Sequence, residues 1–142
     1  MKTELADVNV LVAIAIQEHA DHQAAVDWLR GVEQFATTPV TEMGLLRLLL
    51  NPVIIGVGIT EALDTLRSIK DRPTARFWPD ATSLTDRRAV TAHVTGSKQI
   101  TDTHLLNLAI AHGGRLTTFD KDFLGGLPLK FHSYVRLLNP DQ

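Results

Sequence analysis

The chain has 142 residues, the length of one folded domain, and its 44% apolar and 21% charged residues are typical of a globular protein. It has no cysteine, which excludes disulfides, thiolate metal ligands and a thiol nucleophile. Fourteen basic and sixteen acidic side chains give a net charge of −2, so any binding of nucleic acid must rest on a local patch.

The N-terminal segment predicts a short strand and then a helix, with an acid between them. We expect the strand over residues 2–6, Asp7 at its end, and a helix that begins near Asn9. Only seven consecutive residues here are apolar, from Val10 to Ile16, and acidic residues precede them. This pattern predicts neither a signal peptide nor a membrane span. We therefore expect one domain over residues 1–142, in the cytoplasm and outside the membrane.

The next elements alternate between helix and strand. Residues 22–35 have the apolar spacing of an amphipathic helix, and residues 35–39 predict a short strand. Thr38 followed by Pro39 is typical of a helix start, which places Glu42 in the first turn. Residues 40–50 are apolar nearly all round, which indicates burial on more than one side or a partner.

The stretch from residue 67 to residue 88 is locally basic and contains two aromatic residues. A helix is predicted over residues 59–70 and a strand over residues 75–79. Six cations against three acids surround Phe77 and Trp78 in this stretch. Two interpretations remain open: a nucleic-acid-binding patch, or a solvated basic face with its aromatic side chains turned into the core.

The C-terminal part continues the alternation. A helix over residues 101–112 is expected to be capped by Thr101 or Asp102, and Gly113 and Gly114 end it. A strand over residues 115–119 precedes Asp120, and a fifth, edge strand is expected within residues 129–139. Short strands alternating with helices predict an α/β protein with a mainly parallel sheet.

Four acids are expected at the same edge of this sheet. Asp7 and Asp120 end strands, whereas Glu42 and Asp102 begin helices, and in a parallel sheet both kinds of position lie at the carboxyl edge. Each acid alone is also explained by helix capping. Together they would repel one another, which a divalent cation relieves. Oxygen ligands favour Mg²⁺ or Mn²⁺, and hydrolysis of a nucleic-acid phosphodiester is the natural chemistry.

Four segments of the chain resemble the PIN-domain ribonucleases, and most of all the VapC toxins of toxin–antitoxin systems. In chain order they are DVNVLVA, TEMGLLR, TDTHLLNLA and TTFDKDF. The resemblance extends over nearly the whole chain. It implies a PIN-like open sheet of five parallel strands with helices on both faces. It also implies an endoribonuclease dependent on Mg²⁺ or Mn²⁺, which acts on RNA, forms a homodimer and is blocked by a cognate VapB-type antitoxin.

The same resemblance implies which residues form the site. The four family acids correspond to Asp7, Glu42, Asp102 and Asp120, as catalytic and metal-binding residues. The auxiliary positions are Asn9, Thr118 and Asp122. Two alternatives remain: a haloacid-dehalogenase-like phosphohydrolase, in which a second acid would stand where Asn9 is, and a catalytically inactive PIN fold that only binds.

Overall fold

A five-stranded parallel sheet lies at the centre of the computed structural model, which describes residues 2–86 and 89–139. Its strands are β1 (Glu4–Ala6), β2 (Phe35–Thr37), β3 (Ala75–Phe77), β4 (Arg115–Thr118) and β5 (Val135–Leu137). They lie in the order β3-β2-β1-β4-β5, with every neighbouring pair parallel. The α/β class and the edge position of the fifth strand are therefore confirmed.

The strand order reverses between β1 and β4. From β1 the chain adds β2 and β3 on one side, and β4 and β5 then lie on the other side. Ala6 in β1 pairs with Thr117 in β4, so the residues that follow these two strands emerge side by side. Ligands of open parallel sheets bind at such a reversal, beyond the carboxyl ends of the strands.

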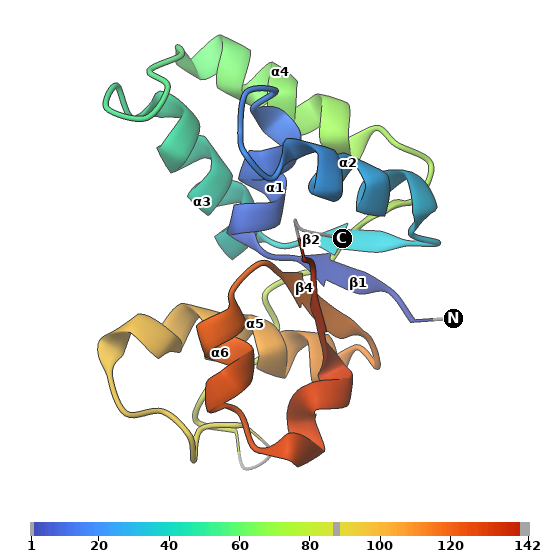
Figure 1. The fold of residues 1–142 in the computed structure, drawn as a ribbon, viewed down its shortest axis with the longest axis vertical. Helices are drawn as coiled ribbons and strands as arrows, with labels where there is room; N and C mark the ends of the chain where they lie inside the picture. Colours follow the sequence, from blue (N-terminus) through green and yellow to red (C-terminus); the bar gives the residue numbers. More distant parts are fainter. Residues whose placement is uncertain (1, 87–88, 140–142) are drawn as a thin grey trace.

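Helices cover both faces of the sheet, as predicted (Figure 1). On one face lie α1 (Val8–Ala15), α2 (His22–Gly31), α3 (Pro39–Leu50) and α4 (Ile59–Lys70). On the other lie α5 (Ile100–Ala111) and α6 (Lys121–Gly126), together with the short 3₁₀ segments η1 (Ser97–Gln99) and η2 (Leu129–Tyr134). No helix in the described part of the chain is long and apolar enough to cross a membrane.

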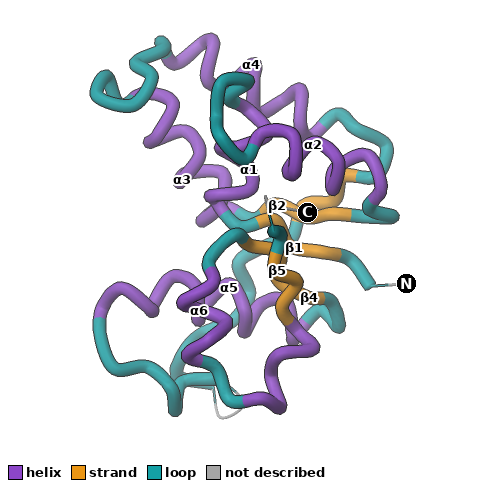
Figure 2. Tube along the Cα trace, viewed as in Figure 1, coloured by secondary structure: helices purple, strands orange, loops and turns teal. Residues whose placement is uncertain are grey.

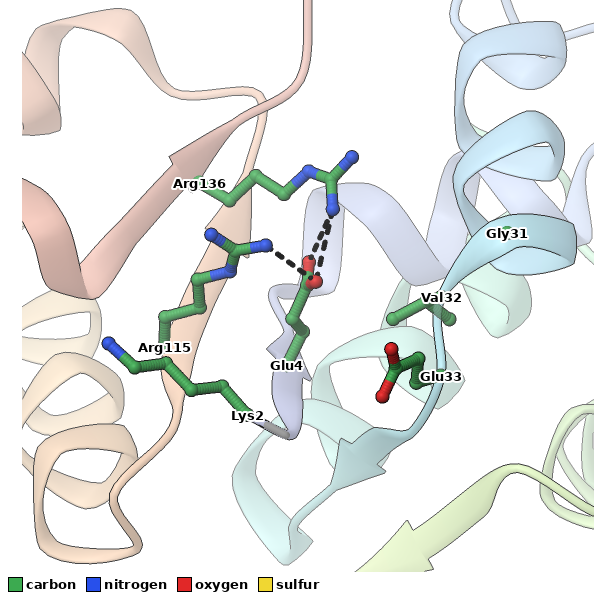
Figure 3. Close-up of a pocket in the computed structure, with 7 residues that line it drawn as sticks. All are labelled: Lys2, Glu4, Gly31, Val32, Glu33, Arg115 and Arg136. Atoms are coloured by element: carbon green, nitrogen blue, oxygen red, sulfur yellow. Dashed lines mark hydrogen bonds and ion pairs between the residues drawn. The ribbon is translucent and has the colours of Figure 1, made fainter.

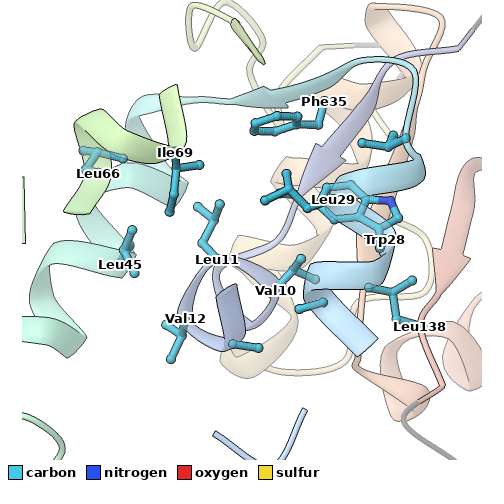
Figure 4. Close-up of a cluster of buried hydrophobic side chains, with 14 of the residues drawn as sticks. Val10, Leu11, Val12, Trp28, Leu29, Phe35, Leu45, Leu66, Ile69 and Leu138 are labelled. Atoms are coloured by element: carbon cyan, nitrogen blue, oxygen red, sulfur yellow. The ribbon is translucent and has the colours of Figure 1, made fainter. Parts of the chain in front are cut away.

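The central strands bury side chains on both faces, because successive residues of a strand point to opposite sides. Leu5 and Ala36 contribute to the core under α5, whereas Ala6 and Phe35 contribute to the core under α1 to α4. Figure 4 shows the second of these cores, with Leu11 among the labelled side chains. The two cores hold the carboxyl ends of β1 and β4 rigidly between the helix layers.

Several boundaries differ from those expected. The first strand starts at Glu4, and α1 starts at Val8 because the Asp7 side chain accepts a hydrogen bond from the Val8 backbone. The expected cap of α5 at Thr101 or Asp102 is wrong, and both residues lie in the first turn. The Gln99 side chain accepts hydrogen bonds from the backbone upstream, so the helical turns begin earlier at η1.

Of two other helix starts, one was predicted from the sequence and one was not. Asp120 caps α6, a six-residue helix that was not predicted, by accepting from the Phe123 backbone at 3.0 Å. By contrast, α3 begins at Thr38 and Pro39 as expected, and the Thr38 backbone N–H donates to Thr41 at 3.1 Å. Both helix starts lie at the carboxyl edge of the sheet.

Gly44 allows α3 to lie against α1. A Cβ atom at this position would stand 2.5 Å from Val8 Cγ2, so a larger residue would push the two helices apart. Val8 directly follows Asp7, and Glu42 is two residues before Gly44. The glycine therefore sets how closely the start of α3 approaches the end of β1.

Candidate active site

Asp7 is the most buried acid at the carboxyl edge, with 5% of its surface exposed. Its Oδ1 accepts from the Val8 backbone at 2.7 Å, and its Oδ2 accepts from the Thr118 hydroxyl at 2.7 Å. Burial, together with the charge of Asp120, raises the pKa of this carboxyl, although its two hydrogen bonds act in the opposite direction. Asp7 is thus held in one orientation by its neighbours.

Thr118 connects Asp7 to the other residues of this edge. Its hydroxyl donates to Asp7 and accepts from the Asn9 side chain at 3.2 Å and from the Asp120 backbone at 3.1 Å. The Asn9 carbonyl oxygen accepts from the Phe119 backbone at 3.3 Å. Two of the three predicted auxiliary residues, Asn9 and Thr118, therefore tie the end of β4 to the start of α1, and Thr118 orients Asp7.

Asp102 is also affected by burial and by the neighbouring acids. It lies in the first turn of α5, and burial raises its pKa to about 7, with further contributions from the charges of Asp7 and Asp120 and from a hydrogen bond with Asp120. Burial alone raises the pKa of a carboxyl, and the two neighbouring charges add to its effect here. Asp7, Asp102 and Asp120 therefore form one coupled group, which we call the acid trio.

Glu42 takes different partners. It lies in the first turn of α3, where Oε2 accepts from the Thr37 hydroxyl at 2.7 Å and pairs with Lys70 Nζ at 2.9 Å. The Glu42 side chain is 14% exposed and that of Lys70 is 35% exposed. The structure thus brings Glu42 to the same edge, where it forms an ion pair with Lys70.

Asp122 is the remaining predicted residue. It is exposed in the first turn of α6, two residues beyond Asp120. An acid in a first helical turn is favoured by the helix dipole, which accounts for Asp122 without a role in the site.

The donor chemistry of the acid trio fits a hard divalent cation, because its atoms are carboxylate oxygens under mutual repulsion. With the side chains oriented as they are in this structure, however, no group of three or more His, Asp or Glu residues among residues 2–86 and 89–139 is arranged to hold a metal ion. The hydrogen bonds explain this. Asp7 and Asp120 turn oxygens toward backbone N–H groups, and Asp102 bonds to Asp120.

Two residues of this edge were not singled out from the sequence. Thr37 ends β2, one strand away from Asp7, and its position at a strand end was the signal that could have identified it. Lys70 ends α4 and appeared only as one cation of a basic stretch. Its contact with Glu42 joins segments that are 28 positions apart, which no local pattern contains.

A different carboxylate, Glu4, is buried at the start of β1, away from the acid trio. It accepts from Trp28 Nε1 at 2.8 Å, Thr117 Oγ1 at 2.7 Å, and Arg115 and Arg136 at 3.0 Å each. Figure 3 shows the two arginines converging on it at the wall of a cavity of about 340 Å³. Burial opposes ionisation, but these donors outweigh it and the pKa of Glu4 is lowered. Glu4 therefore ties β1 to β4, β5 and α2.

The strand reversal, the acid trio and its orienting hydroxyl together form an acidic site at the carboxyl edge of a parallel α/β fold. The PIN domain family model matches residues 5–125, and the chain belongs to this family. Comparison with individual proteins shows which branch of the family the chain resembles. Ribonuclease VapC29 of Mycobacterium tuberculosis is 39% identical over 119 residues, covering 83% of this chain and 86% of that protein.

Two other relatives from the same organism have similar coverage. Ribonuclease VapC39 is 39% identical over 127 residues, covering 83% of this chain and 88% of the relative. Ribonuclease VapC44 is 34% identical over 121 residues, covering 82% and 85%. These matches place the chain with the VapC proteins within the PIN-domain family and confirm the resemblance found in the sequence.

Proposed function

We propose that this chain is an endoribonuclease, dependent on Mg²⁺ or Mn²⁺, and the toxin of a type II toxin–antitoxin pair. The observation that carries the proposal is the acid trio at the strand reversal, with the pKa of Asp102 raised to about 7 by burial and by its two neighbours. The relatives named ribonucleases support RNA as the substrate. The haloacid-dehalogenase alternative belongs to a different family from the one matched here.

Each residue has a separate part in this proposal. Asp7, Asp102 and Asp120 would hold the cation, with Glu42 as a further acidic residue beside them. When bound, Mg²⁺ or Mn²⁺ neutralises charge on a phosphodiester and lowers the pKa of water. Thr118 holds the Asp7 carboxylate in a fixed orientation, so no rotamer has to be selected at the moment of reaction.

The proposal is tested by incubating the purified chain with total RNA. We expect endonucleolytic fragments with Mg²⁺ or Mn²⁺ and none with EDTA. Because a cation that binds only the folded state stabilises it by RT ln(1 + [L]/Kd), the same cations should raise the melting temperature of the metal-free chain. RNA that stays intact with either cation would contradict the activity and leave an inactive, binding PIN fold as the better description.

Apolar side chains are exposed on α3, in the loop after it and at the start of α4. This loop projects from the helix layer (Figure 2). The most exposed are Met43 (50%), Val53 (90%), Ile54 (46%) and Ile59 (53%). Only Thr41, Leu45 and Leu49 of α3 are fully buried. A contiguous exposed apolar surface usually marks an interface. We propose that a second copy of this chain covers it, and that a VapB-type antitoxin binds the homodimer and blocks the acid trio.

Replacing Ile54 with lysine is expected to weaken self-association. A charge placed in an apolar interface must be desolvated, so the variant should be monomeric at concentrations where the wild type is dimeric. Light scattering coupled to size exclusion measures this. Leu129→Lys is the matched control, because Leu129 is 84% exposed but lies in η2. A wild-type chain that is monomeric at tens of micromolar would contradict the homodimer.

A further inference from the structure

Phe77 and Trp78 are adjacent in sequence but have opposite environments. Trp78 is 8% exposed and stacks on His112 with the ring centroids 4.0 Å apart. Phe77 is 48% exposed at the carboxyl end of β3. One of the two aromatic residues of the basic stretch is therefore in the core, as one interpretation expected, and the other is available at the surface.

Phe77 lies at the same edge of the sheet as the acid trio. β3 is two strands away from β1, which corresponds to roughly 10 Å at the usual strand spacing. Phe77 pairs in register with Thr37, whose hydroxyl donates to Glu42. An aromatic ring, a hydroxyl and an acid thus follow one another along the edge toward Asp7.

Lys70 joins Phe77 to this edge. Its Nζ stands 4.7 Å from the Phe77 ring centroid and 2.9 Å from Glu42 Oε2. An ammonium group has three N–H donors, and one carboxylate oxygen and one ring face do not use all of them. Lys70 is 35% exposed, so it can contact an anion from solvent without leaving Glu42.

A further cation lies next to this pair. Arg76 is exposed on β3, and its Nη1 donates to the backbone carbonyls of Pro73 and Ala75 rather than to a carboxylate. Its charge therefore remains available to an anion. The other cations of the stretch noted in the sequence include Arg87 and Arg88, which lie outside the described residues.

We propose that Phe77 and Lys70 form a nucleotide subsite of the RNA substrate. A base flanking the scissile bond stacks on the Phe77 ring, and the adjacent phosphate contacts Lys70. Single-stranded nucleic acid is commonly bound by aromatic stacking combined with backbone cations. The acids at this edge repel RNA, and Lys70, held beside Glu42, offsets part of that repulsion. This inference rests on the proposed function and identifies how its substrate is held.

The test measures binding rather than cleavage. A fluorescein-labelled single-stranded RNA of mixed sequence is titrated with the full-length Asp102→Asn chain, and anisotropy is recorded over a range of salt concentrations. We expect Phe77→Leu to weaken binding by about tenfold, within the range of base–aromatic stacking. Phe77→Trp, which keeps a stacking surface, should bind within about twofold of the parent.

Lys70 is tested by the salt dependence in the same assay. Each phosphate contact to a single strand contributes about 0.7 to the slope of log Kd against log salt. Lys70→Ala should therefore lower the slope by about 0.7, and Phe77→Leu should leave it unchanged. Arg67→Ala is the matched control, because it removes an exposed cation of the same helix that pairs with Asp64. It should change neither value.

The subsite is overturned if Phe77→Leu binds as tightly as the parent, if Lys70→Ala behaves like Arg67→Ala, or if the parent binds no RNA. If these variants melt at a lower temperature but bind RNA with unchanged affinity, the contact between Lys70 and Phe77 only stabilises the packing of α4 against β3. Cleavage of total RNA by the wild type is scored separately. Cleavage with unchanged affinities refutes the subsite alone, whereas changed affinities without cleavage refute the nuclease alone.

Discussion

Asp102→Asn and Asp120→Asn will each lower RNA cleavage by roughly 100-fold or more, the loss expected when a catalytic carboxylate is removed. Asparagine keeps the size of the side chain but removes the negative charge that would hold the cation. Cleavage rates of wild type and variants with Mn²⁺ measure the effect. Asp122→Asn is the matched control, because Asp122 is exposed in the first turn of α6 and should leave the rate unchanged.

The Asp102→Asn substitution should also make the metal-free chain more stable than the wild type at neutral and higher pH. The pKa of Asp102 is raised to about 7 by burial and by Asp7 and Asp120, so its ionised form destabilises the folded state above that pH. As the pH falls below 7, the folded wild type takes up a proton, and the penalty shrinks until it is gone near the ordinary pKa of 3.8, where the unfolded chain is protonated as well. The gain in melting temperature of Asp102→Asn should therefore be larger at pH 8 than at pH 5.5.

Asp7 makes stabilising hydrogen bonds that oppose the effect of its burial. Its carboxylate accepts from the Val8 backbone and from Thr118, so Asp7→Ala removes a helix cap and leaves a buried hydroxyl without an acceptor. We expect this variant to be inactive and, at pH 8, less stable than Asp102→Asn. Cleavage at the wild-type rate by any of the three variants, or a metal-free Asp102→Asn chain that melts lower than wild type at pH 8, would show that the acid trio is misassigned.

Glu4→Ala will lower the stability of the chain by about 3 kcal/mol, or about 10 °C in melting temperature. The carboxylate is 5% exposed, and its loss leaves the Trp28 indole N–H and the Thr117 hydroxyl without their acceptor in the interior. Arg115 and Arg136 are 34% and 42% exposed, so water can replace part of their interaction and keeps the loss below that of a fully buried pair.

The stability that Glu4 contributes depends on pH in a defined direction. Burial opposes its ionisation, but hydrogen bonds from Trp28, Thr117 and Arg115, with the charge of Arg136, lower its pKa below the ordinary value of 4.5. The contribution is complete above about pH 4.5 and is lost as the pH falls through the lower, folded-state pKa. Wild type and Glu4→Ala should therefore converge in melting temperature in strong acid.

Glu33→Ala is the control for this effect. Glu33 is exposed at the same cavity, so its removal changes the local charge without creating an unsatisfied buried group. Its melting temperature should stay close to that of the wild type. If Glu4→Ala also melts like the wild type, the network around Glu4 contributes no net stability.

Much of the fold and part of the site were predictable from local patterns. The ends of β1 and β4 were recognisable from short strands followed by Asp7 and Asp120, and parallel strands send such residues to one edge. By contrast, α6 was missed, because it is six residues long and ends in two glycines, too short for a helical period. The start of α5 was placed late because Gln99, which caps the turns before it, is not a common capping residue.

Only the tertiary structure decided how the charges pair. The sequence placed Glu42 at the start of α3, but its contact with Lys70 depends on how α4 lies against α3, and the period of each helix carries no information on their relative placement. In the sequence, Glu4 is only one residue of a short predicted strand. Its four hydrogen-bond donors come from β4, β5 and α2, which are distant in the chain. Periodicity reports which face of an element is buried, whereas the partner of a buried charge is set by elements far away in the chain.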